Sequence, residues 1–337
     1  MRVSIVVPTY NRREMVVQTI RSLYSQTYPL SRLQVIVADD GSTDGTEQAI
    51  SALDAPFQLQ YRWQPNKGRC AARNLGIRAA HGDLMLFLDG DMVAERQLVA
   101  EHVESHRTQS DVLVRGDIRL LPSLREATPF ARIALAELEK KWGQQVDQDG
   151  FLPFTQMLTG NLSIKSEHLS IMGLMDERFD RGYAWDDVDW GYRAHRLGLR
   201  LLLNLNAVSY HNDYAATDLR AYCRRSRLAS RTAVTNLFAK YPELEGTRPM
   251  FVDKMPVNWY LDSPALIARK LARRFASCRI SLSLLEWMVR VLERHWPEPL
   301  ILGSLYRWVI GGYTYQGYQE GLREREGLED DAETSHA

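Results

Sequence analysis

The sequence predicts an α/β protein with a doubly wound, mostly parallel sheet followed by an α-helical extension. Three observations predict this fold class. Apolar runs alternate with amphipathic stretches over the first hundred residues, which is the order that builds parallel strands through right-handed crossovers. Polar clusters follow three of these runs, at the edge where open sheets bind ligands. From about residue 215 the alternation gives way to long basic segments with helical periodicity.

The first half of the sheet is expected from four apolar runs, each bounded by polar residues or a turn. The expected strands cover 3–8, 33–40, 58–63 and 83–91, with helices between them at about 13–26, 43–53 and 68–80. Later elements are less regular. We expect helices at about 96–106, 124–141 and 185–198, strands at 112–121 and 159–165, and two short strands within 199–211.

Near residue 215 the sequence changes from alternating strand-like and helix-like segments to long basic helical ones, and this change predicts the domain organisation. We expect a first domain over 1–214, which divides near residue 115, and a helical extension over 215–325. The polar end, 326–337, is expected to be disordered because it has few residues to bury.

Composition excludes several classes of function. The chain of 337 residues has 42 basic and 42 acidic side chains, so no overall charge favours nucleic acid as a partner. Cys70, Cys223 and Cys278 are far apart and odd in number, which predicts neither a disulfide framework nor a zinc site and favours the cytoplasm. The longest apolar stretch, 300–313, contains Arg307 and falls short of the roughly 20 residues that span a membrane.

Two carboxylates end the fourth expected strand. Asp89 and Asp91 follow an apolar run and can together hold Mg²⁺ or Mn²⁺ while the metal takes further oxygens from a diphosphate. The imidazole of His211, at another strand end, could complete such a site. The plain alternative is an ordinary Asp-Gly turn. The other two strand ends carry Pro8-Thr9-Tyr10-Asn11 and Asp39-Asp40.

The turn after the second strand begins with two adjacent aspartates, Asp39 and Asp40, which the geometry of a turn does not require. A calcium loop beginning at Asp40 is excluded, because its twelfth position is Ser51 and not a bidentate Glu. Carboxylates such as Asp39 and Asp40 at a strand end commonly accept hydrogen bonds from a base N–H or from ribose hydroxyls.

Basic residues open the third expected helix. Lys67, Arg69 and Arg73 oppose the helix macrodipole there, so we expect a negative charge nearby, and a diphosphate would supply it. The alternative is a basic helix face exposed to solvent.

Three acids lie within one turn of the helix expected at 185–198. Asp186, Asp187 and Asp189 could simply complement the helix dipole, which stabilises by about 0.3–1 kcal/mol per group. A functional interpretation needs one of them as a general base, beside an aromatic ring such as Trp185 on which a sugar can stack.

Taken together and in this order, these segments resemble the family 2 glycosyltransferases with the GT-A fold. The likeness covers about residues 1–213 and lies in VSIVVPTYNR, VIVADDGSTDGT, NKGRCAARNLGI, GDLMLFLDGDM, TGNLSIK and YAWDDVDWGYR. It implies a Rossmann-like GT-A domain in which about residues 1–115 bind a nucleotide-diphosphate sugar, most often a UDP-sugar, and about residues 116–214 bind the acceptor. It also implies an inverting transferase with Mn²⁺ or Mg²⁺ as cofactor.

The resemblance assigns roles residue by residue. The donor would contact Pro8, Thr9, Tyr10, Asn11, Asp39, Asp40, Lys67, Arg73, Asp89 and Gly90. The metal would be held by Asp91, with Asp89 and His211. The catalytic base would be Asp187, with Asp186 standing where the family has Glu, and the acceptor would contact Gly160, Asn161 and Trp185.

The Q-x-x-R-W motif of polymerising members of that family is absent. Leu59 and Ser304 stand at the Gln position before the two Arg-Trp pairs, which favours transfer of a single sugar to a glycan, polysaccharide or glycolipid hydroxyl. Two alternatives remain. A non-catalytic nucleotide-sugar or glycan-binding module would need no base, and a sugar-phosphate nucleotidyltransferase would have a glycine-rich loop where this chain has PTYNRRE.

The extension carries basic helices with an apolar stripe. Ile267, Leu271 and Phe275 repeat at helical spacing among arginines, and a second basic patch lies on 219–231. We expect helices 219–231 and 265–279 to allow peripheral association with the anionic inner face of a cell membrane. The alternative is that the stripe packs on the catalytic domain.

Overall fold

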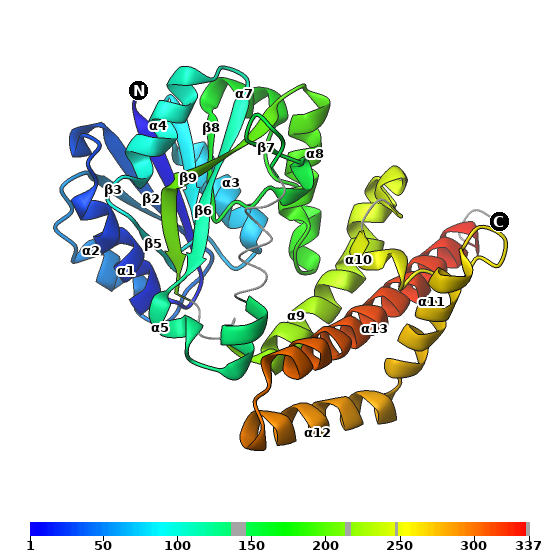
Figure 1. Ribbon diagram of the computed structural model, residues 1–337. Coiled ribbons are helices and arrows are strands. Elements are labelled where there is room, and N and C mark those ends of the chain that lie inside the picture. The colour runs from blue at the N-terminus through cyan, green and yellow to red at the C-terminus, as the bar shows by residue number, and fades with distance from the viewer. Residues whose placement is uncertain (136–145, 213–216, 247–248, 335–337) are drawn as a thin grey trace. The chain divides into compact units, whose positions relative to one another are not determined.

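The computed structural model describes residues 1–135, 146–212, 217–246 and 249–334 (Figure 1). These residues form two compact units. Within the described residues the first unit consists of 1–122, 146–181 and 186–212. The second consists of 123–135, 182–185, 217–246 and 249–334. The second unit therefore begins near residue 215 for most of its length but also takes two earlier segments.

A mixed nine-stranded sheet forms the centre of the first unit, in the order β3-β2-β1-β4-β8-β6-β9-β5 with β7 beside β9. Its parallel half consists of β1 (Val3–Thr9), β2 (Leu33–Asp39), β3 (Gln58–Trp63) and β4 (Leu84–Leu88). The other half consists of β5 (Met92–Ala94), β6 (Val112–Leu120), β7 (Phe151–Leu152), β8 (Asn161–Lys165) and β9 (Arg200–His211). There β8 is antiparallel to β4 and β6, while β9 is parallel to β6.

The parallel half brings the predicted polar clusters to one edge. Thr9 at the end of β1 lies opposite Asp39 at the end of β2. β4 runs parallel to β1 on its other side and ends at Leu88, directly before Asp89. Because parallel strands end on the same side, their following loops share one edge, as the sequence predicts.

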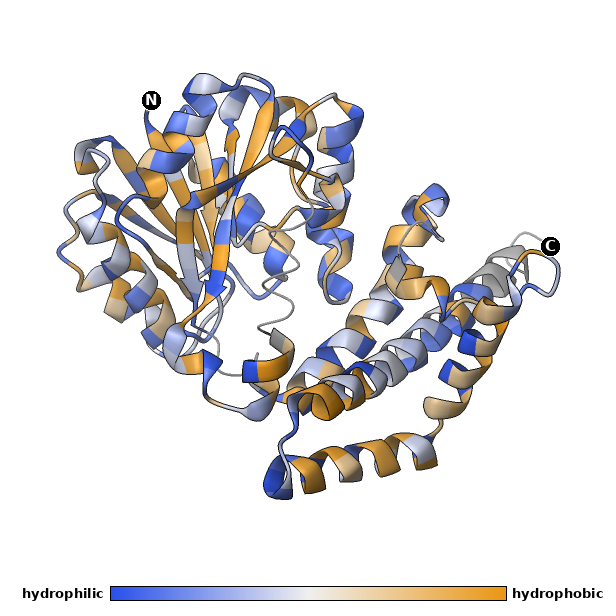
Figure 2. Ribbon diagram, viewed as in Figure 1, coloured by the Kyte–Doolittle hydropathy of each residue, from blue (hydrophilic) through white to orange (hydrophobic). Residues whose placement is uncertain are grey.

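Helices cover both faces of the sheet because its parallel strands are apolar on both sides. They are α1 (Arg13–Ser22), α2 (Thr46–Ser51), α3 (Arg69–Ala79), α4 (Leu98–Thr108), α7 (Ser166–Met172) and α8 (Asp186–Arg196), with 3-10 turns at Leu23–Ser25, Leu30–Arg32, Phe154–Gln156 and Glu177–Arg181. Ile5 and Val7 pack with α1 and α4, whereas Val6 points to the other face against Gly76 of α3. Figure 2 shows the strands as the apolar centre of this unit.

The second unit is helical. It contains α9 (Leu219–Thr232), α10 (Pro249–Val252), α11 (Pro264–Ala276), α12 (Arg279–His295) and α13 (Pro299–Thr334), with π-helical turns at Ala131–Leu135 and Ala233–Phe238 and a 3-10 turn at Pro242–Leu244. The long α13 lies along α9 (Figure 1). A Cβ at Gly317 would meet the carbonyl oxygen of Arg227, so glycine permits this close approach. Figure 2 shows apolar residues along α12, and among them Leu284, Trp287, Met288 and Val291 are exposed.

Two expected elements differ from the structure. The segment 199–211 forms one strand, β9, in place of two short ones. Its pairing with β6 jumps from Asn204 to Val208, so residues 205–207 form a bulge and the strand continues beyond it. The helix expected at 124–141 is interrupted. The short α5 (Pro122–Arg125) ends before Pro129, which cannot donate to a helix interior, and residues 136–141 lie outside the described residues.

The polar end expected to be disordered is helical as far as the structure describes it. α13 continues to Thr334, and 335–337 lie outside the described residues. The reason is that Glu, Arg and Leu in this stretch are good helix formers, and an existing helix extends more easily than a new one starts. No helix in the described ranges is both long and apolar enough to cross a membrane.

Candidate active site

The loop after β1 is tied to the loop after β2. Asn11 has a φ of +49°, and its side-chain oxygen accepts a hydrogen bond from the backbone N–H of Thr43 at 2.9 Å. Its own N–H donates to Ser42 Oγ at 2.7 Å. Tyr10 is 48 % exposed, whereas Thr9 is buried and its Oγ1 has no hydrogen-bond partner among the described residues. Thr9 thus offers an unused polar atom at this edge.

Asp39 is fully buried at the end of β2. Its Oδ1 accepts from the backbone N–H of Ser42 at 2.8 Å, and its Oδ2 accepts from the hydroxyl of Tyr61 at 2.6 Å. A ligand at Asp39 would therefore share this carboxylate with Tyr61, a residue on β3 that lies outside every motif predicted from the sequence.

Asp40 has a structural task. Its carboxylate accepts from the backbone N–H groups of Lys67 at 2.9 Å and Gly68 at 2.8 Å, and from the side chain of Gln64. These bonds fix the loop that leads into α3. The side chain of Lys67 remains exposed at this loop.

The N-terminus of α3 is already occupied by a carboxylate. Asp180 accepts from the backbone N–H groups of Cys70 at 2.8 Å and Ala71 at 3.0 Å. Gly68, with a φ of +114°, leaves room for it, since a Cβ there would lie 2.3 Å from Asp180. The chain itself therefore supplies a negative charge at this helix end.

A second contact joins the middle of α3 to the same segment. The amide of Asn74 donates to the carbonyl of Met175 at 3.0 Å and to Glu177 at 2.9 Å, and it accepts from the N–H of Met175 at 2.9 Å. Residues 175–181 are therefore hydrogen-bonded to α3 both at its N-terminus and at its middle.

Arg73 is buried between two acids. Its guanidinium donates to Asp89 at 2.7 Å and lies 3.5 Å from Asp186, which Arg69 also contacts at 3.0 Å. Burial alone would lower the pKa of Arg73, but the charges of Asp89 and Asp186 outweigh it and raise that pKa. Arg73 therefore links the end of β4 to the first turn of α8.

Asp187 differs from its neighbour Asp186. Its Oδ1 accepts from the hydroxyl of Thr159 at 2.7 Å and from the N–H of the same residue at 3.3 Å. Burial, and then the charge of Asp186, raise the pKa of Asp187 to about 7. Two arginines neutralise Asp186, whereas Asp187 can take up and release a proton near neutral pH, as a general base must.

Asp91 and His211 lie together at the next part of the edge. The Met92–His211 pairing of β5 with β9 brings His211 Nε2 within 3.4 Å of Asp91 Oδ2, which Arg12 contacts at 2.5 Å. Burial favours the protonated carboxyl, but His211 and Arg12 together hold the pKa of Asp91 below its usual value.

These residues fit a divalent cation in part. Asp91 Oδ1 is buried with no hydrogen-bond partner within the described ranges, and carboxylate oxygen with imidazole nitrogen suits Mn²⁺. Asp89 instead points to Arg73, and the described residues contain no group of three His, Cys, Asp or Glu that could hold a metal. Among the described residues Asp91 and His211 would therefore be the two ligands, and the others would come from diphosphate oxygens and water.

The three predicted acceptor residues lie in tight packing. Asn161 is fully buried, and its amide donates to Ala207 at 2.9 Å and Ser209 at 3.0 Å while its oxygen contacts His102 at 2.8 Å. The buried Gly160 would place a Cβ 3.1 Å from Asp89. Both positions shape the site from behind, and Asn161 has its polar groups engaged within the fold.

Trp185 belongs to the second unit. It is 8 % exposed, its indole N–H donates to the carbonyl of Ala229 at 2.5 Å, and its ring lies 5.6 Å from that of Phe251. This packing leaves the ring little surface for stacking on a sugar.

A buried histidine pair supports β8 from α4. His102 and His106 both contact the hydroxyl of Ser163 at 2.8 Å. Burial lowers the pKa of His102 to about 4 and that of His106 to about 3, so both are neutral at physiological pH. They hold the strand that begins at Asn161.

Glycine packing joins the loops after β1 and β4. A Cβ at Gly90 would lie 2.7 Å from the carbonyl oxygen of Pro8. The two loops thus meet backbone to backbone, and any larger residue at 90 would separate them.

Four residues of the site are not predicted from the sequence: Arg12, Tyr61, Thr159 and Asp180. Arg12 follows directly after the polar cluster of β1, and Thr159 precedes the Gly-Asn pair, so their positions beside motifs could have indicated them. Asp180 lies in a segment with no periodicity and carries no signal of its partner.

Comparisons with known proteins show which family model and which relatives this chain resembles. Residues 4–122 match the family model described as Glycosyl transferase family 2. The chain is 29 % identical over 273 residues to the uncharacterized glycosyltransferase YfnE of Bacillus subtilis, covering 66 % of this chain and 68 % of that protein. It is 28 % identical over 224 residues to validoxylamine A glucosyltransferase of Streptomyces hygroscopicus subsp. jinggangensis, covering 60 % of this chain but only 53 % of that protein.

Solved structures share the fold. The mannosyltransferase PcManGT from Pyrobaculum calidifontis, in complex with GDP-Man and Mn²⁺, superposes with a TM-score of 0.60 at 17 % identity over 95 % of this chain and 88 % of that one. S. aureus TarS 1–349 in complex with UDP-GlcNAc gives 0.51 at 15 % identity over 97 % and 92 %. The predicted GT-A-like α/β fold with C-terminal helices is confirmed.

Proposed function

Because residues 4–122 make this chain a member of glycosyl transferase family 2, we propose that it moves a single sugar from a nucleotide-diphosphate sugar to a hydroxyl acceptor with inversion. The donor is a UDP-sugar in the simplest case, and the acceptor is a glycan, polysaccharide or glycolipid. The similar structures hold GDP-Man or UDP-GlcNAc, which supports a nucleotide-sugar donor without selecting the nucleotide.

The difference between Asp186 and Asp187 carries this proposal. Arg69 and Arg73 both pair with Asp186, and the charge of Asp186 helps burial to raise the pKa of Asp187 to about 7. A binding module needs no carboxyl tuned in this way, so the pair favours catalysis over the non-catalytic alternative.

The proposed step is a single displacement. The acceptor hydroxyl loses its proton to Asp187 Oδ2, since Thr159 bonds to Oδ1 of that carboxylate. The acceptor oxygen forms a bond to the anomeric carbon as the bond to the diphosphate oxygen breaks, and the electron pair leaves with the diphosphate. Thr159 thereby fixes which oxygen faces the acceptor.

Donor binding is assigned to the strand-end loops. Thr9, Tyr10 and Asp39 would contact the base and ribose, while Asp91 and His211, with Asp89 nearby, would hold the cation. A bound divalent cation would supply positive charge to the departing diphosphate. Arg73 would act from behind by fixing Asp89 and Asp186, and it is not expected to touch the donor.

The acid limb of the pH profile should report Asp187. Its raised pKa means that the carboxyl is protonated below about pH 7 in the free protein and inactive as a base. We expect kcat/KM to rise with pH up to about 7 and then level off. Measuring kcat/KM from pH 5 to 9 checks this, and a profile flat down to pH 5 would exclude Asp187 as the base.

Asp91 should make donor binding metal-dependent. UDP-, GDP- and dTDP-sugars are screened by thermal shift with Mn²⁺, Mg²⁺ or EDTA, and one donor should raise Tm only with metal. Asp91→Ala should abolish this shift, because it removes the buried carboxylate beside His211. Asp111→Ala, which removes an exposed carboxylate, is the control and should keep it. An equal shift in both variants would place the cation elsewhere.

We also propose that the second unit attaches the protein to the cytoplasmic face of a membrane. Leu271, Phe275 and Trp287 are 44 %, 75 % and 55 % exposed, and arginines neighbour them on α11 and α12. Apolar side chains beside cations suit an anionic bilayer surface. Pelleting with phosphatidylglycerol vesicles at low salt tests this, and no binding would remove it.

A further inference from the structure

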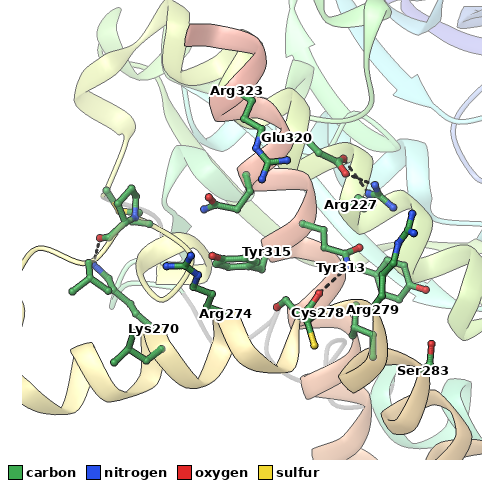
Figure 3. Close-up of a pocket in the computed structure, with 18 of the residues that line it drawn as sticks. Arg227, Lys270, Arg274, Cys278, Arg279, Ser283, Tyr313, Tyr315, Glu320 and Arg323 are labelled. Atoms are coloured by element: carbon green, nitrogen blue, oxygen red, sulfur yellow. Dashed lines mark hydrogen bonds and ion pairs between the residues drawn. The ribbon is translucent and has the colours of Figure 1, made fainter. Parts of the chain in front are cut away.

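The second unit contains a groove of about 1130 Å³ that has no part in the reaction proposed above (Figure 3). It is lined by side chains of α9, α11, α12 and α13 and by residues 255–259. Pockets for drug-sized ligands are about 300–1,000 Å³, so this groove is large enough for an extended ligand.

The lining is strongly basic. It contains the five cationic residues Arg227, Lys270, Arg274, Arg279 and Arg323 against the two acids Glu286 and Glu320. Both acids are engaged: Glu320 pairs with Arg227, and Glu286 accepts from the hydroxyl of Tyr313 at 2.6 Å. Lys270 pairs with Asp262 at 2.6 Å.

Three arginines are left with their charge uncompensated. No carboxylate of the described part of the chain pairs with Arg274, Arg279 or Arg323, and all three are exposed. Figure 3 shows Arg274 and Arg323 reaching into the groove from α11 and α13 near Tyr315, with Arg279 further along beside Tyr313. These three positive charges along one groove repel each other, and a bound anion would offset this repulsion.

We propose that this groove binds a ligand with at least two phosphate groups, held by Arg274, Arg279 and Arg323. Guanidinium groups bind phosphate through paired N–H donors, and their spread along the groove suits successive phosphates better than one small anion. The ligand is either a soluble oligophosphate or the phosphates of lipid head groups.

Cys278 provides a local readout of occupancy. It lines the groove and is exposed, whereas Cys70 and Cys223 are buried. We expect tripolyphosphate to slow alkylation of Cys278 by iodoacetamide in the full-length protein, relative to sodium chloride of equal ionic strength. At about ten times the dissociation constant the slowing should be about tenfold, because only unliganded protein reacts.

Matched arginine variants test the assignment. The triple variant R274Q/R279Q/R323Q should lose the protection by tripolyphosphate. The control R21Q/R32Q/R107Q removes the same charge from exposed arginines of the first unit, outside the groove, and should keep it. For each variant, the rate of Cys278 alkylation with ligand is divided by its rate without ligand, so a change in the intrinsic reactivity of the thiol cancels. Protection absent from the wild type, or equal in both variants, would overturn the proposal.

Vesicles then distinguish the two sources of phosphate. Pelleting with phosphatidylglycerol in phosphatidylcholine should be lost in the groove variant and kept in the control if lipid phosphates are the ligand. If both variants pellet equally and only the control is protected by tripolyphosphate, the ligand is a soluble oligophosphate. No nucleotide sugar is present in either assay, so their outcome is independent of the transferase proposal.

Discussion

Replacing Asp187 by Asn is expected to lower kcat by about 10²–10⁴-fold, the usual contribution of a general base. The amide keeps the size of the side chain and an oxygen that can accept from Thr159, but it cannot take the acceptor proton. Donor affinity should change little, since the proposed donor contacts lie on the strand-end loops. The measurement is kcat with both substrates saturating, together with the donor-induced rise in Tm.

The control for this variant is Glu167→Gln, which neutralises a carboxylate that is 69 % exposed on α7. It should transfer sugar at the wild-type rate. A near-normal kcat for Asp187→Asn with intact donor binding would show that another group accepts the proton. Donor hydrolysis should fall in parallel if water uses the same base.

Replacing Arg73 by Met should destabilise the first unit by about 3–5 kcal/mol, as expected when one partner of a buried ion pair is removed. Asp186 would then keep only the partly exposed Arg69, and Asp89 would lose its partner at 2.7 Å. The expected fall in Tm is on the order of 10 °C. Thermal and urea unfolding of the purified variant measure it.

Arg78→Met on the same helix is the matched control. Its guanidinium is 56 % exposed and lies 4.0 Å from Glu177, an arrangement worth about 0–1 kcal/mol. If Arg73→Met unfolds at the same temperature as Arg78→Met, then Asp89 and Asp186 are solvated well enough without Arg73. The interpretation of Arg73 as a link between β4 and α8 would then be wrong.

The sheet edge could be predicted because strand order alone determines it. Asp39 and Asp89 end parallel strands, so their meeting follows from topology, and the apolar runs that define those strands are plain in the sequence. The position of Asp91 beside His211 depends on the register between β5 and β9, which no pattern in the sequence determines, although the place of His211 at a strand end suggested the pair.

What could not be predicted depends on contacts between segments far apart in the chain. Asp180 reaches α3 across more than a hundred residues, and nothing near it in the sequence indicates that partner. Likewise, residue type does not reveal that the polar groups of Asn161 and Trp185 form hydrogen bonds within the fold. A buried amide and an exposed one look alike in sequence.

The attachment of residues 175–181 to α3 has a consequence for engineering. If residues 1–115 bind the donor and residues 116–214 bind the acceptor, as we propose, the two segments could be exchanged separately between relatives to combine donor and acceptor preferences. Yet α3, which lies within residues 1–115, is capped by Asp180 and bonded through Asn74 to Met175, and both partners lie within residues 116–214. A chimera joined near residue 115 would therefore need α3 and 175–181 from the same parent, so that the transplanted unit is discontinuous in sequence.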